Sequence, residues 1–428
     1  MSSELKQRKT GSEQNGPVAA PEPRKLTMEE VVGPSQHGPP MQLLRIVAFG
    51  VYFLGSCLFL HAAQLLAWPL YFFNRVAFYD YMSLTKSYFG VLITTMTRLW
   101  SPTVIRVSGD KSMKGLLHQK GQHGMLEVDF GERVILIANH QIYTDWLYLW
   151  WIAYTNSPPT HGHIYIILKE SLRYLPMMGP AMMFFNFIFM SRKWAKDQAR
   201  LRRRIQKLNT KGGQTPDGKQ HLDPMWLLIF PEGTNLSANT RKASARYSAK
   251  SGIPDMKHQV LPRSTGLQCC LQGLHTTVDY IYDCTIAYEG IPPGGYGQDI
   301  FTLRSVYFQG RAPKSVNMHW RRFAVKDLPI DDADAMGDWI MQRWREKDEL
   351  IEAFHQTGKF PADLEAVQIE GAPSEKQFKT AYINTQVMPR NSFEFLGMFV
   401  PVIAATMVGR IGVRFFDQFL GTKPLFGG

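Results

Sequence analysis

The sequence predicts an α/β fold in which a mixed, largely parallel sheet is flanked by helices, with an N-terminal membrane helix or helical hairpin. Between residues 133 and 354, short apolar runs alternate with longer stretches of helical character. Strands that are apolar throughout are typical of a parallel sheet covered on both faces. Upstream, no charged residue occurs from Ile46 to Asn74. Such a run exceeds the roughly 20 apolar residues that cross a bilayer.

The N-terminal segment differs in composition from the rest of the chain. Residues 1–40 are polar and rich in Pro, Gly, Ser and charged residues. This composition predicts a disordered tail, because such a segment cannot bury enough apolar surface to fold. Several glutamates interrupt it, so it has the character neither of a secretory signal nor of a mitochondrial presequence.

Residues 41–100 form the predicted membrane-embedded helical segment. Arg45 and Arg75 flank the uncharged run, and Pro69 is expected to kink or end its helix. A shorter apolar run from Tyr88 to Thr97 could be the return arm of a hairpin or an amphipathic surface helix. The alternative for the longer run is a buried core helix.

Residues 101–330 form the predicted main domain. Its expected strands are 133–139, 163–168, 225–230, 280–288, 303–308 and 318–325, and its expected helices are 145–155, 180–187, 195–208 and 238–251. A further helix is expected beyond this domain, at 333–354. Residues 331–390 are expected to be a helical extension, and residues 391–428 an apolar membrane-associated segment. Within the latter, the apolar run 395–409 is too short for a full span and favours an interfacial, re-entrant or packing helix.

The chain is basic, with 48 Lys and Arg against 36 Asp and Glu and a net charge of +12. This balance suits nucleic acid, anionic lipid or phosphorylated substrates. The sequence has no nucleic-acid-binding motif, and its apolar segments favour lipid. The four cysteines lack the spacing of a zinc site, so we expect a reducing compartment without a disulfide framework. His161 and His163 resemble half of a metal site, but no third ligand is apparent, so no metal is expected.

A histidine followed by an aspartate marks the end of one predicted strand. His140 and Asp145 lie five residues apart within residues 139–146, NHQIYTDW. If the strand ends at Asn139 and a helix starts near Thr144, the carboxylate can fold back onto the imidazole. An acid placed in this way fixes the tautomer of a general base, whose other ring nitrogen takes a proton. The alternative is a satisfied histidine beside a helix-capping acid.

A second motif, FPEGT at residues 230–234, follows another apolar run. Pro231 cannot continue a central strand, and Gly233 permits a left-handed turn or the close approach of a ligand to the backbone. Taken alone, this segment favours a plain strand-to-helix connection over a functional site.

The two motifs in this order resemble the NHxxxxD and FPEGT motifs of the membrane-bound glycerolipid acyltransferases, the family that includes the 1-acylglycerol-3-phosphate acyltransferases. Residues 186–192 resemble its second motif, GxIFIDR, with Asn186 for the glycine and Ser191 for the acid, but with Arg192 kept. Residues 260–266 stand where a fourth motif is expected. Shorter strings are similar to the lysocardiolipin and lysophosphatidylinositol acyltransferases, including those at 191–194, 283–288 and 343–347.

The resemblance implies an acyl-CoA-dependent lysophospholipid acyltransferase whose catalytic domain is residues 101–330. His140 would take the proton of the free glycerol hydroxyl, Asp145 would orient the imidazole, and the hydroxyl would attack the thioester directly. Because CoA leaves as a good thiolate, no covalent acyl-enzyme and no bound cofactor are required, and acyl-CoA is the co-substrate. The sequence contains no GxSxG nucleophile element.

Several residues are expected to bind substrate. A carboxylate is a poor phosphate ligand, so Glu232 is expected to bond backbone donors or a substrate hydroxyl, while backbone N–H groups near Gly233 face an anion. Arg192 offers the bidentate fork that suits phosphate. Asn139 could bind substrate or hold its turn. The expected substrate-binding residues are Asn139, Lys169, Arg192, Pro231, Glu232, Gly233, Thr234 and Arg263.

The sequence contains two basic helical faces, and their function is left open. Each could meet CoA phosphates, a lipid headgroup or the anionic leaflet, or could simply be solvated. One comprises Arg200, Arg203, Arg204 and Lys207, and the other comprises Lys242, Arg246 and Lys250.

The alternatives of function are acylation of lysophosphatidic acid in de novo phosphatidic acid synthesis, a lipase-type hydrolase, and a non-catalytic lipid-binding membrane protein that keeps the fold. The expected partners are acyl-CoA, a lysophospholipid and the bilayer, without nucleic acid. We expect the membrane of the endoplasmic reticulum, with the site facing the cytosol, or alternatively a mitochondrial membrane.

Overall fold

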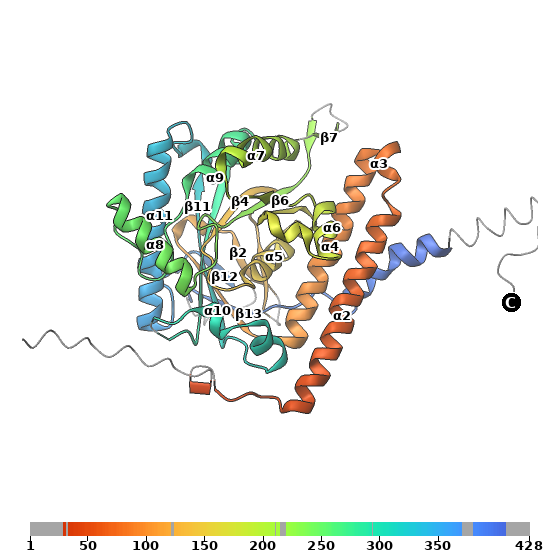
Figure 1. Ribbon diagram of the computed structural model, residues 1–428, viewed down its shortest axis with the longest axis horizontal. Coiled ribbons are helices and arrows are strands. Elements are labelled where there is room, and N and C mark those ends of the chain that lie inside the picture. The colour runs from red at the N-terminus through yellow and green to blue at the C-terminus, as the bar shows by residue number, and fades with distance from the viewer. Residues whose placement is uncertain are drawn as a thin grey trace, which may run out of the picture.

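The computed structural model describes residues 29–30, 33–120, 124–209, 211–214, 220–292, 294–369 and 380–407. Its central sheet has eight strands in the order β13-β1-β11-β10-β4-β9-β5-β6 (Figure 1). Neighbouring strands are parallel except for β13 with β1 and β10 with β11. The strands are β1 Val104–Gly109, β4 Arg133–Ala138, β5 Ile164–Lys169, β6 Ile188–Met190, β9 Met225–Ile229, β10 Tyr280–Tyr288, β11 Ser315–Ala324 and β13 Ile383–Gln386. The prediction of a mixed, largely parallel sheet is confirmed.

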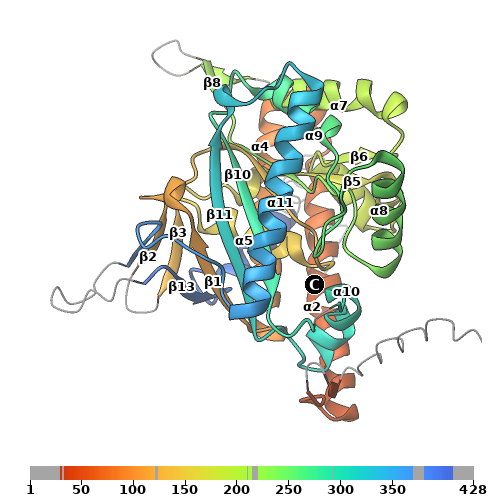
Figure 2. The same ribbon diagram turned by 90° about the vertical axis from the view of Figure 1, so that its left-hand side faces the viewer.

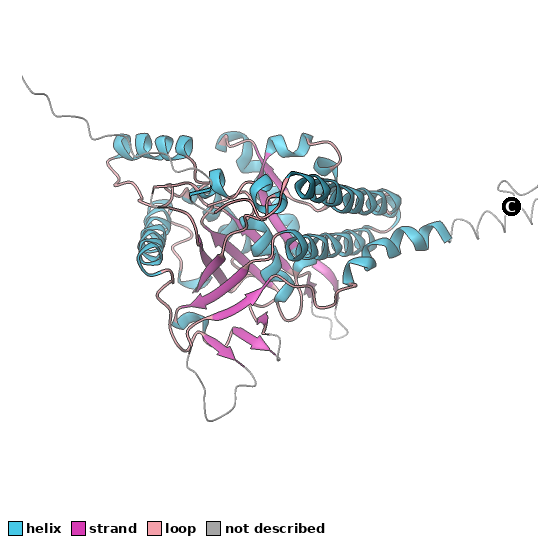
Figure 3. Ribbon diagram, turned by 90° about the horizontal axis from the view of Figure 1, so that it is seen from below, coloured by secondary structure: helices cyan, strands magenta, loops and turns pink. Residues whose placement is uncertain are grey.

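Helices cover the sheet on both faces, as Figures 2 and 3 show. They are α5 Asp145–Thr155, α6 Met178–Phe184, α7 Trp194–Leu208, α8 Ala238–Ser251, α9 Ser264–Leu274, α10 Gly297–Ile300 and α11 Ala333–Thr357. Two small sheets lie outside the central one. They consist of β2 Leu117–Lys120, β3 Met125–Val128 and β12 Val367–Ile369, and of β7 Lys211–Gln214 with β8 Gln220–Leu222.

The side chains of β4 alternate between two hydrophobic cores, as the twofold period of a strand requires. Val134 and Leu136 belong to one core, which also contains residues of α5, whereas Ile135 and Ile137 belong to the other, which contains residues of α7, α9 and α11. Every residue of β4 after the first is buried. This explains why the sequence of the strand is a continuous apolar run rather than an alternating one.

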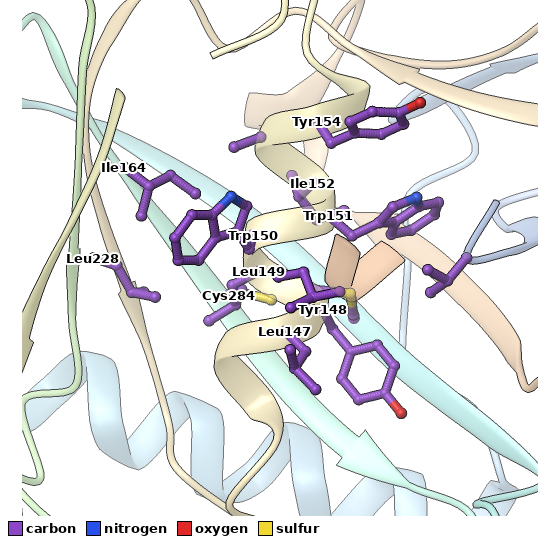
Figure 4. Close-up of a cluster of buried hydrophobic side chains, with 14 of the residues drawn as sticks. Leu147, Tyr148, Leu149, Trp150, Trp151, Ile152, Tyr154, Ile164, Leu228 and Cys284 are labelled. Atoms are coloured by element: carbon purple, nitrogen blue, oxygen red, sulfur yellow. The ribbon is translucent and has the colours of Figure 1, made fainter. Parts of the chain in front are cut away.

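The helix after the first motif, α5, is buried on nearly all sides. Ten of its eleven residues are buried, and Figure 4 shows its aromatic side chains projecting in different directions among Ile164, Leu228 and Cys284. A helix enclosed in this way is held rigidly by packing. The first residue of α5 is Asp145, so this packing also fixes the position of the predicted acid.

The N-terminal segment is a helical hairpin of α2 Pro39–Leu66, the short α3 Leu70–Phe73 and α4 Arg75–Trp100. Residues Pro39–Phe73 make up one helical stretch that is long and apolar enough to cross a membrane, and only 17% of its most apolar window is buried. In contrast, α4 is buried against the domain at most positions from Phe78 to Thr97. The second apolar run is therefore the return arm of a hairpin.

The C-terminal apolar segment begins with the 3-10 turn Glu394–Phe399 and continues as a helix to Met407. It packs on the hairpin, because Phe399 meets Phe59 edge to face and Phe395 contacts Tyr52. The rest of this segment, 408–428, lies outside the described residues, as do residues 1–28 and 31–32 of the predicted disordered tail.

One predicted strand is wrong. Residues Arg304–Phe308 form a π-helix instead. The backbone N–H of Ser305 donates to the Thr302 hydroxyl, and its own hydroxyl donates to Ile300 carbonyl oxygen, which starts a helical turn. Val306 and Tyr307 are buried in the same core as α5. A short apolar run cannot be assigned to strand or helix by periodicity alone.

Other differences are smaller. The helix expected at 180–187 is Met178–Phe184, and residues 331–390 hold α11 together with β12 and β13, the latter pairing with β1 at the edge of the central sheet. The sequence reasoning did not find β1, β13 or α9.

Candidate active site

The predicted site residues gather at one edge of the sheet. The strands β10, β4, β9, β5 and β6 are adjacent and parallel, so their carboxyl ends lie along one edge, where α/β sheets bind ligands. Tyr288 ends β10, His140 follows β4, the FPEGT turn follows β9, Lys169 ends β5 and Arg192 follows β6.

His140 and Asp145 form a hydrogen-bonded pair. The imidazole Nδ1 lies 2.7 Å from Asp145 Oδ2. A carboxylate can only accept this bond, so Nδ1 carries the proton and Nε2 is left to accept one. The His140 side chain is 19% exposed whereas that of Asp145 is fully buried. The ring of His140 also stacks on Phe230, with 4.3 Å between ring centroids. The chemistry of a base oriented by an acid is therefore in place.

Asp145 is fixed by donors other than its histidine. The backbone N–H groups of Gln141 and Ile142 donate to Oδ2 at 2.7 and 3.0 Å, and the Tyr288 hydroxyl donates to Oδ1. These bonds satisfy the oxygens of a side chain that is otherwise removed from water. Tyr288 thus belongs to the same hydrogen-bonded cluster, although the sequence reasoning did not single it out.

Asn139 is buried, and its side-chain amide is hydrogen-bonded to the backbone of β10. Its amide nitrogen donates to Ile286 carbonyl oxygen at 3.0 Å, and its amide oxygen accepts from the Ile286 N–H at 2.8 Å. The side chain thus joins β4 to β10 where the strand ladder ends. Of the two roles expected for Asn139, this geometry supports holding the turn over binding substrate.

The FPEGT turn lies directly beside His140. Gly233 adopts a φ of 68°, which only glycine takes without strain, and its N–H donates to Phe230 carbonyl oxygen at 2.9 Å. No heavy atom lies within 4 Å of the position a Cβ would take on Gly233. The backbone of this turn is therefore open to a ligand. Thr234 follows it and is half-buried.

Glu232 is buried, and its carboxyl group is hydrogen-bonded to the loop that carries His140. Its Oε1 accepts from the His140 backbone N–H at 3.1 Å and from the Trp344 indole N–H at 3.4 Å, as expected for a carboxyl that bonds backbone donors. Its Oε2 has no hydrogen-bond partner among the described residues. Burial raises the pKa of Glu232 to about 8, against the opposing effect of these two hydrogen bonds. The group is therefore largely protonated at neutral pH.

Trp344 comes from α11, far along the sequence from both motifs. It is fully buried, and the neighbouring Lys347 anchors the helix to β10. Lys347 Nζ donates to Cys284 carbonyl oxygen at 2.6 Å and lies 2.5 Å from Asp283. Both residues fall in the strings that carried the subgroup resemblance, but nothing in the sequence placed them behind the FPEGT turn.

Arg192 sits on a strained turn that a buried acid organises. Arg192 has a φ of 65°, a conformation rare outside glycine. Asp197 Oδ1 accepts from the Ser191 N–H and hydroxyl at 3.0 and 2.9 Å, and Oδ2 accepts from the Lys193 N–H at 3.2 Å. Burial would raise the pKa of Asp197, but these bonds lower it overall. The acid missing at Ser191 is thus supplied six residues later.

Asn186 accounts for the other departure from the second motif. It stands where the family has glycine, and its φ is 58°. Asparagine tolerates this left-handed conformation better than most residues. A glycine at this position could adopt the same conformation.

A second arginine lies close to Arg192. Burial, and then the positive charge of Arg263, lower the pKa of Arg192. The N–H of Arg263 donates to Pro231 carbonyl oxygen at 2.9 Å, which ties it to the FPEGT turn. No described acid forms a salt bridge with either arginine. Two like charges held together without an acid favour an anionic ligand. Lys169, exposed at the end of β5, pairs in register with Met190 beside this turn.

An apolar cavity of ≈ 200 Å³ lies next to the start of α5. Its walls come from α2, α4, α5, β5 and α6. Trp146 lines it and directly follows Asp145, while Leu168 lines it and directly precedes Lys169. Met182, Phe185 and Phe187 close another side. Such a cavity suits a hydrocarbon chain.

The histidines that resembled half of a metal site have structural contacts. His161 is buried and its ring packs on Tyr154, and His163 Nε2 lies 3.0 Å from the Ser83 hydroxyl. Within the described ranges, no group of three or more His, Cys, Asp or Glu side chains is placed to hold a metal ion.

Comparison with known proteins agrees with this geometry. Residues 104–288 match the family model described as acyltransferase, and residues 307–388 match the model described as acyltransferase C-terminus. The first match contains both motifs, and the second contains Trp344.

Three relatives illustrate the range of similarity. An uncharacterised acyltransferase of Schizosaccharomyces pombe is 38% identical, over 71% of this chain and 82% of its own length. The 2-acyl-1-lysophosphatidylinositol acyltransferase of Saccharomyces cerevisiae is 38% identical, over 73% of this chain and 85% of its own length. The lysocardiolipin acyltransferase 1 of Gallus gallus is 30% identical, over 54% of this chain and 56% of its own length. The chain belongs to the acyltransferase family and is an acyltransferase enzyme.

Proposed function

We propose that this enzyme transfers a fatty acyl chain from acyl-CoA to the free glycerol hydroxyl of a lysoglycerophospholipid. The observation that carries the proposal is the 2.7 Å pair of His140 and Asp145. An apolar cavity lined by Trp146, the next residue, and the arginine pair at the same edge of the sheet accompany it. An acceptor with a phosphate and a hydroxyl, and a donor with a long chain, both find complementary surfaces there.

The reaction follows from the protonation of the dyad. His140 Nε2 removes the proton from the acceptor hydroxyl as its oxygen attacks the thioester carbonyl carbon. The tetrahedral intermediate collapses, the carbon–sulfur bond breaks, and the CoA thiolate takes the proton from the imidazolium. Asp145 keeps its position throughout, because its three other donors hold both of its oxygens. A base of this kind contributes about 10²–10⁴ in rate.

Arg192 and Arg263 are the proposed ligands of the acceptor phosphate, with Lys169 beside them. Arginine binds phosphate through two parallel hydrogen bonds. The link from Arg263 to Pro231 keeps this anion site next to the FPEGT turn and hence near His140. The backbone of Gly233 and Thr234 is proposed to contact the same phosphate.

The cavity beyond Trp146 is the proposed site of the donated chain. Its lining is almost entirely apolar, and Gln64 is the polar exception among the described residues that line it. An acyl chain there would leave its thioester at the mouth, beside the dyad. Burying a methylene contributes about 0.8 kcal/mol, so the cavity favours long chains over short ones.

Lysophosphatidylinositol or monolysocardiolipin is the proposed acceptor, because relatives of those names share up to 38% identity with this chain. Lysophosphatidic acid is the second candidate, since a probable 1-acyl-sn-glycerol-3-phosphate acyltransferase of Arabidopsis thaliana is 34% identical over 58% of this chain. A non-catalytic lipid-binding role is disfavoured, because such a protein has no need for a dyad with a free Nε2.

The bilayer is the proposed partner of the hairpin. Large apolar side chains are exposed along α2, among them Val51, Leu58 and Leu65, and exposed apolar surface of this extent marks a membrane contact. We place the enzyme at the endoplasmic reticulum with its site facing the cytosol, where acyl-CoA is supplied. A mitochondrial membrane is the alternative.

An acceptor screen tests the proposal. Purified enzyme is given one labelled acyl-CoA with lysophosphatidylinositol, monolysocardiolipin or lysophosphatidate, and released CoA and labelled phospholipid are measured. We expect equal amounts of the two products, and only when donor and acceptor are both present. Release of CoA without acceptor, or consumption of a diacyl lipid without CoA, would contradict it.

A further inference from the structure

A basic cleft lies outside the catalytic site, between α6 and α7. Its volume is ≈ 340 Å³. Four of its lining residues lie on one face of α7, at the helical spacing noted in the sequence, and one comes from the turn before α6. These are Arg173, Arg200, Arg203, Arg204 and Lys207.

The positive charge of this basic cleft is largely uncompensated. Glu170 is the acid that the described residues place among these side chains, and it accepts from Arg200 at 2.8 Å while also lying 3.9 Å from Lys196. No salt bridge to a described acid is formed by Arg203, Arg204 or Lys207. Like charges confined around one cleft repel, so an anion in the cleft would be stabilising.

The basic cleft adjoins the membrane hairpin. Arg204 lies within electrostatic range of Tyr79 on α4. Met183 lines the cleft, and the next residue, Phe184, packs against Phe78 of α4. The end of the hairpin nearest to this contact exposes Trp68, Phe72 and Phe73, which are 54%, 74% and 87% exposed. Basic groups beside exposed aromatic and apolar side chains are typical of a surface that meets an anionic bilayer.

The basic cleft is separate from the dyad. Helix α7 begins at the catalytic edge of the sheet and runs back along it. Arg204 is ten residues beyond the first residue of α7, which places it roughly 15 Å along the helix axis. The arginines proposed for the acceptor, Arg192 and Arg263, do not line this cleft.

We infer that the basic cleft of α7 binds the phosphate of an anionic membrane phospholipid and thereby seats the α3 end of the hairpin on an anionic bilayer. The inference goes beyond acyl transfer, and it rests on the proposed contact of the hairpin with the bilayer. Phe187 is shared by the basic cleft and the apolar cavity, so apolar surface lies next to the phosphate position for the lipid tails.

The second basic face of the sequence provides a matched control. Lys242, Arg246 and Lys250 are exposed on α8, which lies on the opposite side of the molecule from the hairpin in Figure 1. Their number and charge equal those of Arg203, Arg204 and Lys207. Replacing either set by glutamate changes the net charge by the same amount, so an effect specific to one set cannot come from overall charge.

The experiment measures binding of dioctanoyl phosphatidylserine to the full-length enzyme in neutral detergent, with dioctanoyl phosphatidylcholine as the neutral lipid. The first variant is Arg203→Glu/Arg204→Glu/Lys207→Glu, and the control is Lys242→Glu/Arg246→Glu/Lys250→Glu. We expect preference for the anionic lipid, weakened about a hundredfold in the first variant, because each basic side chain contributes roughly a factor of five near anionic lipid. The control should bind as the wild type does.

Competition identifies the source of the phosphate. Inorganic phosphate or CoA is added at the lipid concentration, and neither should displace the lipid. Displacement by CoA would assign the basic cleft to the donor and overturn the inference, as would displacement by free phosphate or equal binding of the two lipids. Acyl transfer by both variants in neutral vesicles verifies that they are folded. If the wild-type enzyme also shows no acyl transfer there, the result contradicts the proposed acyl transfer rather than this inference.

Discussion

The geometry of single residues decides what this site can do. Asp145 is fully buried, and its two oxygens accept four hydrogen bonds, from His140, Gln141, Ile142 and Tyr288. A buried carboxylate needs such donors to stay ionised. The imidazole in turn stays in one tautomer, with Nε2 facing away from its acid.

Replacing Tyr288 by phenylalanine tests the least expected of these donors. The change removes one hydroxyl from a fully enclosed site. We expect kcat to fall about tenfold to a hundredfold, because a hydrogen bond to a charged group contributes about 1.5–3 kcal/mol. The measurement is steady-state CoA release. Tyr280→Phe, at the exposed start of the same strand, should leave kcat unchanged, and a Tyr288→Phe enzyme with wild-type kcat would contradict the role.

Glu232 gives a prediction about pH. Burial raises its pKa to about 8, above its unfolded value, so the folded state holds the proton more tightly. The stability linked to this proton is fully present below the unfolded pKa of about 4.3 and is lost as pH rises through the folded pKa. Glu232→Gln cannot ionise, so its Tm should exceed that of the wild type at about pH 9 and approach it at about pH 5.

Thermal unfolding of the two proteins across this range measures the effect. A constant difference in Tm at all pH values would contradict it. Because glutamine keeps an oxygen that can accept from the His140 N–H, Glu232→Gln should also retain more activity at neutral pH than Glu232→Ala, which leaves that N–H unpaired.

At the scale of elements, the sequence predicted what is local and apolar. The strands β4 and β9 and the helix α5 are continuous apolar runs, and α11 has apolar residues at helical spacing. The strands β1 and β13, at one end of the sheet, were missed because polar residues such as Arg106 and Asn384 interrupt their apolar pattern. The run 304–308 was predicted as a strand although it is a helix, because buried segments are apolar in either kind of secondary structure.

The site was predictable only where its residues are close in sequence. His140 and Asp145 are linked by one turn, so their spacing was informative. Tyr288 and Trp344 reach the site through the order of strands and the course of α11. No local pattern encodes that juxtaposition, because it depends on long-range packing.

Helix α11 supplies the next prediction. Trp344 is the contact between the C-terminal part of the chain and Glu232. Trp344→Phe keeps the apolar bulk but removes the indole N–H, so the FPEGT turn loses one constraint. We expect kcat to fall about tenfold with little change in acyl-CoA KM, since a displaced catalytic group costs rate. Trp339→Phe, on the same helix against Phe323, should retain wild-type kcat. Equal loss in both variants would indicate general destabilisation instead.

The apolar cavity predicts how chain length is selected. Ala181 lines it on α6, and Ala181→Phe would fill part of its ≈ 200 Å³. The preference for long over short acyl-CoA, as the ratio of kcat/KM values, should fall about tenfold, because two lost methylene sites cost about 1.6 kcal/mol. The exposed Ala249→Phe on α8 is the control. An unchanged ratio for Ala181→Phe would show that the chain binds elsewhere.

The whole molecule places this chemistry beside a hydrophobic face. Helix α4 is buried against the domain along most of its length, while α2 covers it and exposes apolar side chains outward. The C-terminal helix Glu394–Met407 adds Val400, Ile403 and Met407 to the exposed apolar surface. A lysophospholipid in the bilayer and a chain in the cavity would therefore approach the same edge of the sheet from neighbouring surfaces.

The most direct test of the account is turnover by His140→Ala with acyl-CoA and lysophospholipid both supplied. We expect a loss of about 10²–10⁴ in kcat at wild-type Tm, because the imidazole is the proposed base and its side chain is partly exposed. His275→Ala, an exposed histidine that follows the last residue of α9 and precedes the start of β10, should keep full activity. A folded His140→Ala enzyme that turns over at the wild-type rate would contradict the central claim.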